Sequence, residues 1–256
     1  MSVSLENFAG CEERPEAQSL IDRLRRARDL VRGRLLLTSS FGIEDQLLTH
    51  AAAEAGCELE IVTLDTGRLF PETYEVWSET ERRYGMRIRA FTPDPRDLEP
   101  LVARMGINGF RESVENRKSC CNVRKVQPLR RALHGAAGWI SGLRASQSKA
   151  RTEVRFLAQD YEYGLLRINP LFDWTREQVA KAVREQGVPY NRLEDEGVLS
   201  IGCQPCTRAV LPGEDERAGR WWWEHGSDRE CGLHVAPDGR LVRSRSGEGI
   251  HHEPSR

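Results

Sequence analysis

Five of the seven cysteines in this chain stand in arrangements that could do chemistry. Cys120 and Cys121 are adjacent, Cys203 and Cys206 form a C-x-x-C pair, and Cys231 stands alone within Glu-Cys-Gly-Leu-His. Four thiolates from two distant segments are enough to hold one metal centre. A lone thiol beside glycine and histidine has the character of a nucleophile. The pattern therefore indicates a metal-cluster protein that does covalent sulfur chemistry.

Each cysteine pair, taken alone, also has a simpler interpretation. Cys203 and Cys206 would suit a structural zinc site or a redox pair, and Cys120 and Cys121 would suit buried packing. Adjacent cysteines fit one tetrahedral zinc poorly because their side chains diverge, whereas each thiolate of an iron–sulfur cube binds a different iron. A disulfide framework is not expected, since the cysteine count is odd and the chain is long. Taken together, the four thiolates favour a [4Fe–4S] cluster.

The composition of the chain limits its partners and its compartment. With 256 residues it can bury a full core in one domain, and its net charge of −1 provides no general attraction to nucleic acid or anionic membranes. No apolar run approaches the length of a membrane span, and the first residues lack the plan of a signal peptide. Free thiolates and a cluster both require a reducing compartment, so we expect a cytoplasmic protein without nucleic-acid or membrane partners.

Short apolar runs alternate with helix-like segments along the chain. We expect strands over residues 34–40, 59–64, 86–92, 139–144 and 165–169. We expect one helix over 44–55, ended by Gly56, and another from Pro71 to Gly85, because proline favours the first helical turn and glycine the C-terminal end. This alternation predicts a single-domain α/β fold with a mainly parallel sheet flanked by helices.

Ligands of such sheets bind beyond the carboxyl ends of the strands. The residues expected there are Ser39, Ser40, Gly42, Asp45, Asp65, Thr66, Gly67 and Arg144. Backbone N–H groups at the start of the helix after Gly42 would form an anion site, although an ordinary strand–helix turn is the alternative. The loop is neither a Walker A loop nor G-x-G-x-x-G, and it lacks the S-G-G-x-D-S loop of ATP pyrophosphatases. We therefore expect a bound nucleotide whose α–β phosphate bond is not split.

With these motifs in view, the chain closely resembles the assimilatory sulfonucleotide reductases, and among them the cluster-containing adenylyl-sulfate (APS) reductases. The resemblance extends from about Leu35 to His234. The motifs that carry it are Ser39–Asp45, Leu64–Tyr74, Lys118–Lys125, Gly142–Arg144, Gly202–Thr207, Gly213–Trp223 and Glu230–His234.

The resemblance implies the adenine-nucleotide α-hydrolase-like fold, which is related to the PP-loop and HUP folds. It implies one reductase domain over residues 1–234, with a flexible C-terminal segment (about 207–234) that carries the catalytic cysteine. The composition after Leu233, rich in Gly, Pro, Arg and His with little apolar periodicity, predicts a flexible tail over 235–256. The resemblance further implies reduction of APS to sulfite and AMP in sulfate assimilation and cysteine biosynthesis, with electrons from thioredoxin. The four paired cysteines are expected to hold the cluster, which tunes the site electrostatically.

The resemblance also implies roles for six further residues. Cys231 would attack the sulfur of the sulfate group and form an S-sulfocysteine that thioredoxin cleaves. His234 would lower the pKa of that thiol or stabilise the leaving group, and Lys125 would lie between cluster and substrate. Arg217 and Arg220 would share one face of a helix and bind phosphate and sulfate oxygens, as would Arg144. Ordinary surface residues or a solvated charged turn are the alternatives. Trp221 to Trp223 are expected to pack in the core.

Two departures from the family pattern concern the nucleotide. Residues 145–148 read Ala-Ser-Gln-Ser where many relatives carry Arg-(Asp/Glu)-Gln-Ser, and residues 39–42 read Ser-Ser-Phe-Gly, closer to some phospho-APS (PAPS) reductases. A PAPS reductase with the same covalent step is therefore the first alternative. An ATP-using thiolation or adenylation enzyme and a non-catalytic metal-binding redox protein are more remote ones. The sequence leaves the oligomeric state open and allows a homo-oligomer.

Overall fold

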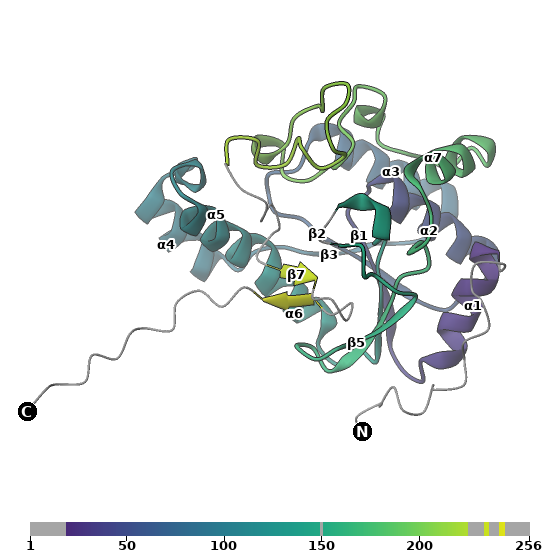
Figure 1. Ribbon diagram of the computed structural model, residues 1–256. Helices are drawn as coiled ribbons and strands as arrows, with labels where there is room; N and C mark the ends of the chain where they lie inside the picture. Colours follow the sequence, from purple (N-terminus) through teal and green to yellow (C-terminus); the bar gives the residue numbers. More distant parts are fainter. Residues whose placement is uncertain (1–18, 149–150, 225–232, 236–240, 244–256) are drawn as a thin grey trace, which may run out of the picture.

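The computed structural model describes residues 19–148, 151–224, 233–235 and 241–243. At its centre is a six-stranded sheet with the order β3-β2-β1-β4-β6-β5 (Figure 1). The strands are β1 (Leu35–Ser39), β2 (Glu60–Leu64), β3 (Arg89–Phe91), β4 (Gly138–Ile140), β5 (Leu157–Asp160) and β6 (Leu165–Ile168). All neighbours pair in parallel except β5, which runs antiparallel to β6. The prediction of a mainly parallel sheet is confirmed.

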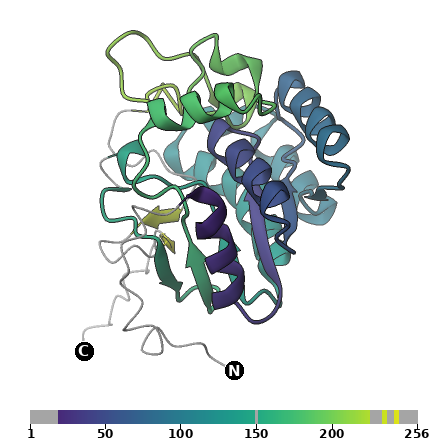
Figure 2. The same ribbon diagram turned by 90° about the vertical axis from the view of Figure 1, so that its right-hand side faces the viewer.

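Helices cover both faces of this sheet (Figures 1 and 2). They are α1 (Leu20–Leu30), α2 (Ile43–Ala55), α3 (Pro71–Tyr84), α4 (Pro95–Met105), α5 (Val114–Cys121), α6 (Gln127–Leu133) and α7 (Arg176–Glu185). Helix α2 contacts α1, α7 and β1, whereas α6 contacts β2 and β3. None of the helices in the described part of the chain is long and apolar enough to cross a lipid bilayer.

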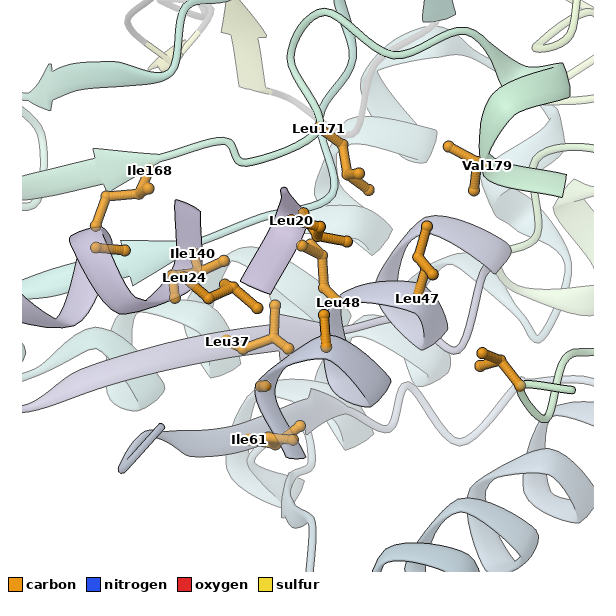
Figure 3. Close-up of a cluster of buried hydrophobic side chains, with 14 of the residues drawn as sticks. Leu20, Leu24, Leu37, Leu47, Leu48, Ile61, Ile140, Ile168, Leu171 and Val179 are labelled. Carbon is orange, nitrogen blue, oxygen red and sulfur yellow. The ribbon is translucent and has the colours of Figure 1, made fainter. Parts of the chain in front are cut away.

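The central strands bury apolar side chains on both faces. On one face Leu37, Ile61, Ile140 and Ile168 meet residues of three helices (Figure 3). These helical residues are Leu20 and Leu24 of α1, Leu47 and Leu48 of α2, and Val179 of α7. On the other face Leu36, Val62 and Trp139 pack against Leu129 and Leu133 of α6. Burial on both faces explains why the strands read as continuous apolar runs.

The predicted ends of two helices are confirmed. Helix α2 ends at Gly56 and α3 ends at Gly85, and both glycines are left-handed with φ of 62° and 61°. Pro71 occupies the first turn of α3. These residues act locally, since glycine accepts a positive φ and the fixed φ of proline suits a helix start.

Other boundaries differ from the prediction. Strand β3 is three residues long because only Arg89–Phe91 pairs with β2, and β4 ends at Ile140, before the loop that holds Arg144. Helices α1, α4, α6 and α7 and the antiparallel edge strand β5 were not predicted from the sequence. A flexible tail was expected over 235–256, and within it β8 (Leu241–Arg243) pairs antiparallel with β7 (Leu233–Val235).

Candidate active site

A cavity of about 330 Å³ lies at the carboxyl ends of β1, β2 and β4, beneath the loops that follow α7. Figures 1 and 2 show these loops, coloured green to yellow-green, across one end of the molecule. Eight of the predicted residues line this cavity, which we call the nucleotide cavity after the ligand that the sequence predicts: Ser39, Ser40, Gly42, Asp45, Thr66, Lys125, Arg217 and Arg220. Among the described residues, Asp65, Gly67 and Arg144 do not belong to the lining. The strand-end rule therefore located the cavity correctly.

Asp45 ties the first loop of the nucleotide cavity together. Its Oδ2 accepts hydrogen bonds from the backbone N and the Oγ of Ser40, each at 2.7 Å. Gly142 approaches from β4 so closely that a Cβ atom there would lie 2.5 Å from Oδ1 of Asp45. Burial raises the pKa of Asp45 to about 6. Asp45 thus shapes the loop, and glycine at 142 lets the next loop reach it.

Phe41 gives this loop its unusual backbone. Its φ is 59°, a left-handed value that is uncommon for an aromatic residue, and its side chain is fully buried. The ring stacks on Trp77 of α3, with centroids 5.4 Å apart. Aromatic packing therefore holds the backbone in a conformation that turns Ser39, Ser40 and Gly42 toward the cavity.

The second loop, after β2, is held by its own side chains. Asp65 Oδ1 accepts hydrogen bonds from the backbone N of Gly67 at 2.9 Å and from the hydroxyl of Tyr74 at 2.8 Å. Thr66 is buried and lies on the boundary between the nucleotide cavity and the cysteines, because the thiol of Cys203 donates to its Oγ1 at 3.2 Å. Asp65 and Gly67 therefore fold the loop, and Thr66 faces the site.

The four paired cysteines line a second, smaller cavity. Cys120 and Cys121 end α5, whereas Cys203 precedes a 3-10 turn (Gln204–Cys206) and Cys206 ends it. Cys121, Cys203 and Cys206 are buried and Cys120 is half-buried, all packed with Phe110 and Trp221. Trp221 is 1 % exposed, so the expectation of core packing is confirmed for it. Two distant segments thus bring four thiols to one enclosed place.

This cysteine cavity is apolar enough to oppose free thiolates. Burial raises the pKa of Cys206 to about 12, and burial also raises the pKa of Cys120. Cationic side chains act in the opposite direction: Arg124 lowers the pKa of Cys120, and Lys125 and Arg220 lower that of Cys206. Thiolates here require a strong cationic partner, which is the property of a metal–sulfur site.

Cationic side chains surround the four thiols. Arg117, Arg124, Lys125 and Arg220 line the same cavity as the cysteines. Among the described residues, no group of three or more His, Cys, Asp or Glu side chains is placed to hold a metal ion. Four thiols beside four cationic side chains have the chemistry that an anionic iron–sulfur cluster would require.

Lys125 and Arg220 are the two described residues that line both cavities. Lys125 lies on a π-helical turn (Asn122–Val126) between α5 and α6, which is wider than a regular α-helix. Such turns redirect side chains and are frequent at functional sites. Arg220 is buried, and its guanidinium lies 4.6 Å from the ring centroid of Trp221. Two cations thus separate the cysteines from the nucleotide cavity.

The arginines at 217 and 220 lie in a turn, so the prediction that they share a helix face is wrong. Backbone N–H groups of Ala218 and Arg220 donate to the carbonyls of Asp215 and Arg217, and an isolated bridge joins Arg220 to Thr207. The turn nevertheless directs both arginines to the nucleotide cavity.

Arg144 occupies a different place from the one predicted. It is fully buried behind the cavity wall, and its guanidinium contacts the carboxylates of Glu44 and Glu216. The carboxyl end of β4 brings it near the site, as expected, but Glu44 and Glu216 line the cavity and Arg144 does not. This arrangement favours a structural contact over direct substrate binding.

Several cavity residues were missed by the sequence analysis. They are Glu44, Trp139, Gln147, Arg151, Arg167, Glu194 and Glu216. Arg167 carried a signal, since it interrupts the apolar run of β6; it is 2 % exposed, lies 4.1 Å from the ring centroid of Trp139, and burial lowers its pKa to about 9. Glu44 stood inside the loop motif but was not considered.

The proposed nucleophile Cys231 lies outside the described residues. His234 falls in β7, where its backbone pairs with Val242. The roles of both residues stay predictions from the sequence.

Comparison with known proteins agrees with this architecture. The family model "Phosphoadenosine phosphosulfate reductase domain" matches residues 34–209. The chain is 52 % identical over 204 residues to an adenosine 5′-phosphosulfate reductase of Agrobacterium fabrum, covering 80 % of this chain and 78 % of that one. It is 48 % identical over 200 residues to the enzyme of the same name from Allochromatium vinosum, covering 78 % of each.

A solved structure supports the fold. The phosphoadenylyl-sulfate reductase of Candida auris, in a phosphate complex, superposes with a TM-score of 0.69 at 24 % identity, covering 82 % of this chain and 99 % of that one. The expected fold class is therefore confirmed, and on the family match and the relatives together, the chain belongs to the phosphoadenosine phosphosulfate reductase family.

Proposed function

We propose that this protein reduces adenosine 5′-phosphosulfate to sulfite and AMP in sulfate assimilation. The observation that carries the proposal is the pair of cavities joined by Lys125 and Arg220. One cavity suits a nucleotide and the other gathers four thiols, so cationic groups stand where the phosphosulfate end would meet sulfur chemistry. The names of the relatives at about half identity agree with this substrate.

The proposed reaction has two steps. The thiolate of Cys231 attacks the sulfur of the phosphosulfate, the sulfur–oxygen bond to AMP breaks, and an S-sulfocysteine forms. A thiolate of reduced thioredoxin then attacks the Cys231 sulfur and releases sulfite, and its second thiol closes a thioredoxin disulfide that regenerates Cys231. The two electrons come from thioredoxin, so the protein supplies binding, orientation and charge.

The cavity residues have distinct tasks in this proposal. Ser39, Ser40 and Gly42 bind the nucleotide at the start of α2, where backbone N–H groups and the helix dipole favour anions. Arg217 and Arg220 donate to phosphate and sulfate oxygens, since planar guanidiniums match oxyanions. His234 supports the thiolate or the leaving oxygen.

We also propose that Cys120, Cys121, Cys203 and Cys206 hold a [4Fe–4S] cluster. Their shared cavity, their burial and the surrounding cations support this donor set. The bound cluster would supply a fixed negative charge next to Lys125 and Arg220. Free thiols and a cluster suit a reducing compartment, which supports a cytoplasmic location.

The experiment is a sulfite assay with reduced thioredoxin as the donor and APS or PAPS as the substrate. Sulfite from APS, at a much higher kcat/KM than from PAPS, is the expected result. A preference for PAPS would replace the substrate and keep the chemistry. Pyrophosphate release from ATP without sulfite formation would instead establish the thiolation or adenylation alternative.

A further inference from the structure

The guanidinium of Arg144 is saturated by protein groups. Nε donates to Oε1 of Glu44 at 2.9 Å, and Nη2 donates to both oxygens of Glu216, at 2.6 and 2.8 Å. Nη1 donates to Oγ of Ser146 at 2.6 Å. Because the side chain is also fully buried, it has little capacity left for a substrate oxygen.

The two carboxylates come from separate segments of the chain, and both residues line the nucleotide cavity. Glu44 lies in the first turn of α2, directly after the loop that begins at Ser39. Glu216 immediately precedes Arg217 and lies four residues before Arg220. One buried guanidinium therefore ties the nucleotide loop to the turn that carries both arginines.

Other contacts hold the same turn to a second segment of the chain. Arg208 pairs with Glu214 at 2.8 Å and donates its backbone N–H to the carbonyl of Gly219, and Thr207 bridges to Arg220. These contacts attach the turn to the segment of Cys206. Glu216 attaches the turn, through Arg144, to Glu44 beside the nucleotide loop. The turn is therefore held at two places, by the segment of Cys206 and by the start of α2.

Simple electrostatics makes Glu216 an unexpected neighbour for an anionic ligand. Its carboxylate lines the cavity and would repel a phosphate or sulfate group. Arg144 and, at 3.6 Å, Arg176 compensate its charge. A carboxylate at this position therefore needs a reason other than contact with the nucleotide.

We propose that Arg144 and Glu216 are positioning residues, which hold Arg217 and Arg220 in place for the phosphate and sulfate end of the substrate. This inference rests on the proposed function. A positioning role and a simple charge effect predict opposite changes in anion affinity. If charge alone mattered, removing the negative charge of Glu216 would tighten anion binding. If Glu216 holds the arginines in place, removing that charge would weaken anion binding.

The test measures binding of AMP and of adenosine by calorimetry to the parent protein and to Glu216→Gln. We expect AMP affinity to fall at least about tenfold, because a fall of this size corresponds to the loss of one charge-assisted hydrogen bond between an arginine and the phosphate. Adenosine affinity should change less than about twofold, since the proposal assigns Arg217 and Arg220 to phosphate and sulfate oxygens, which adenosine lacks. Glu196→Gln, at an exposed position outside the turn, is the matched control and should affect both ligands equally little. Unchanged or tighter AMP binding by Glu216→Gln would overturn the inference.

Arg144→Lys keeps the positive charge but loses the planar guanidinium that contacts both carboxylates. It is a second, independent variant that still tests the inference if Glu216→Gln does not fold. Because both residues act through one contact, Arg144→Lys combined with Glu216→Gln should lose no more AMP affinity than the weaker-binding single variant. Losses that multiply would assign Arg144 to the substrate directly and overturn its positioning role. A parent protein that binds neither APS nor AMP would contradict the proposed function itself.

Discussion

The guanidinium of Arg220 occupies the space that a side chain on Gly202 would need. A Cβ atom on Gly202 would lie 2.5 Å from Cζ of Arg220, a separation that no packed pair tolerates. Gly202 directly precedes Cys203, so the cysteine turn and the cation that separates the two cavities are fitted to each other. A glycine is therefore required at position 202 because the Arg220 side chain leaves no room for a Cβ atom, and not because of an unusual backbone conformation.

Gly202→Ala should displace Arg220 from the boundary between the cavities. We expect kcat/KM for APS to fall about tenfold or more, since a lost donor to a developing oxyanion typically costs this much. Adenosine affinity should stay unchanged. Steady-state kinetics of sulfite formation, together with calorimetry, checks this.

Gly164→Ala is the control for that experiment. Gly164 has a φ of 66°, and the place of its Cβ atom is open, so alanine there should reduce stability through backbone strain only. Equal activity losses in the two variants would show that the effect of Gly202 is not specific to Arg220.

Cys203→Ser should abolish cluster binding. One of four thiolates is lost from an enclosed cavity, and a serine oxygen is a poor ligand for iron in such a site. Iron and acid-labile sulfide, measured in anaerobically purified protein, should both fall to a small fraction of the parent values.

Cys57→Ser is the matched control, because Cys57 packs at the edge of the main core and lies outside the cysteine cavity. It should keep iron and sulfide. A colourless parent protein with one zinc would contradict the cluster and support a non-catalytic metal-binding protein.

Glu194 should make the stability of the protein depend on pH. Burial raises its pKa from 4.5 to about 7, against the opposing effect of Arg176. The folded state therefore keeps a proton that the unfolded state has released. Its stabilising contribution is complete below pH 4.5 and is lost as the pH rises through 7.

Relative to the parent, Glu194→Gln should thus gain unfolding free energy between pH 5 and pH 8, on the order of 2 kcal/mol. Urea denaturation at both pH values measures the difference. Burial lowers the pKa of His50, which changes stability in the opposite direction, but it does so in both proteins and cancels. Glu185→Gln, at an exposed site, should show no such gain, and a gain of the same size there would refute the assignment.

The sequence predicted those features that depend on local chemistry. Pro71, Gly56 and Gly85 set helix ends through their own backbone preferences, and the strand-end rule placed Ser39 to Asp45 and Thr66 correctly. The sequence also predicted that Cys120 and Cys121 lie beside Cys203 and Cys206, because two such pairs together supply the four thiolates of one metal centre.

The features that were missed depend on contacts between distant residues. Arg144 looked like a ligand because the sequence cannot show that Glu44 and Glu216, 100 and 72 residues away, occupy its guanidinium. The turn at Arg217 is set by a bridge to Thr207, and no periodicity reports it. Strand β5 is short, and its pairing with β6 is decided by the tertiary fold.

The central claim is that Cys231 becomes sulfonated by APS, and intact-mass spectrometry tests it most directly. Anaerobically purified protein is incubated without reductant with APS, with PAPS, or with neither. The account predicts a gain of one sulfonate from APS, located at Cys231 by peptide mapping and absent in Cys231→Ser, which should still bind its cluster. A parent protein that binds APS and gains no mass, or a Cys231→Ser variant that forms sulfite at the parent rate, would contradict it.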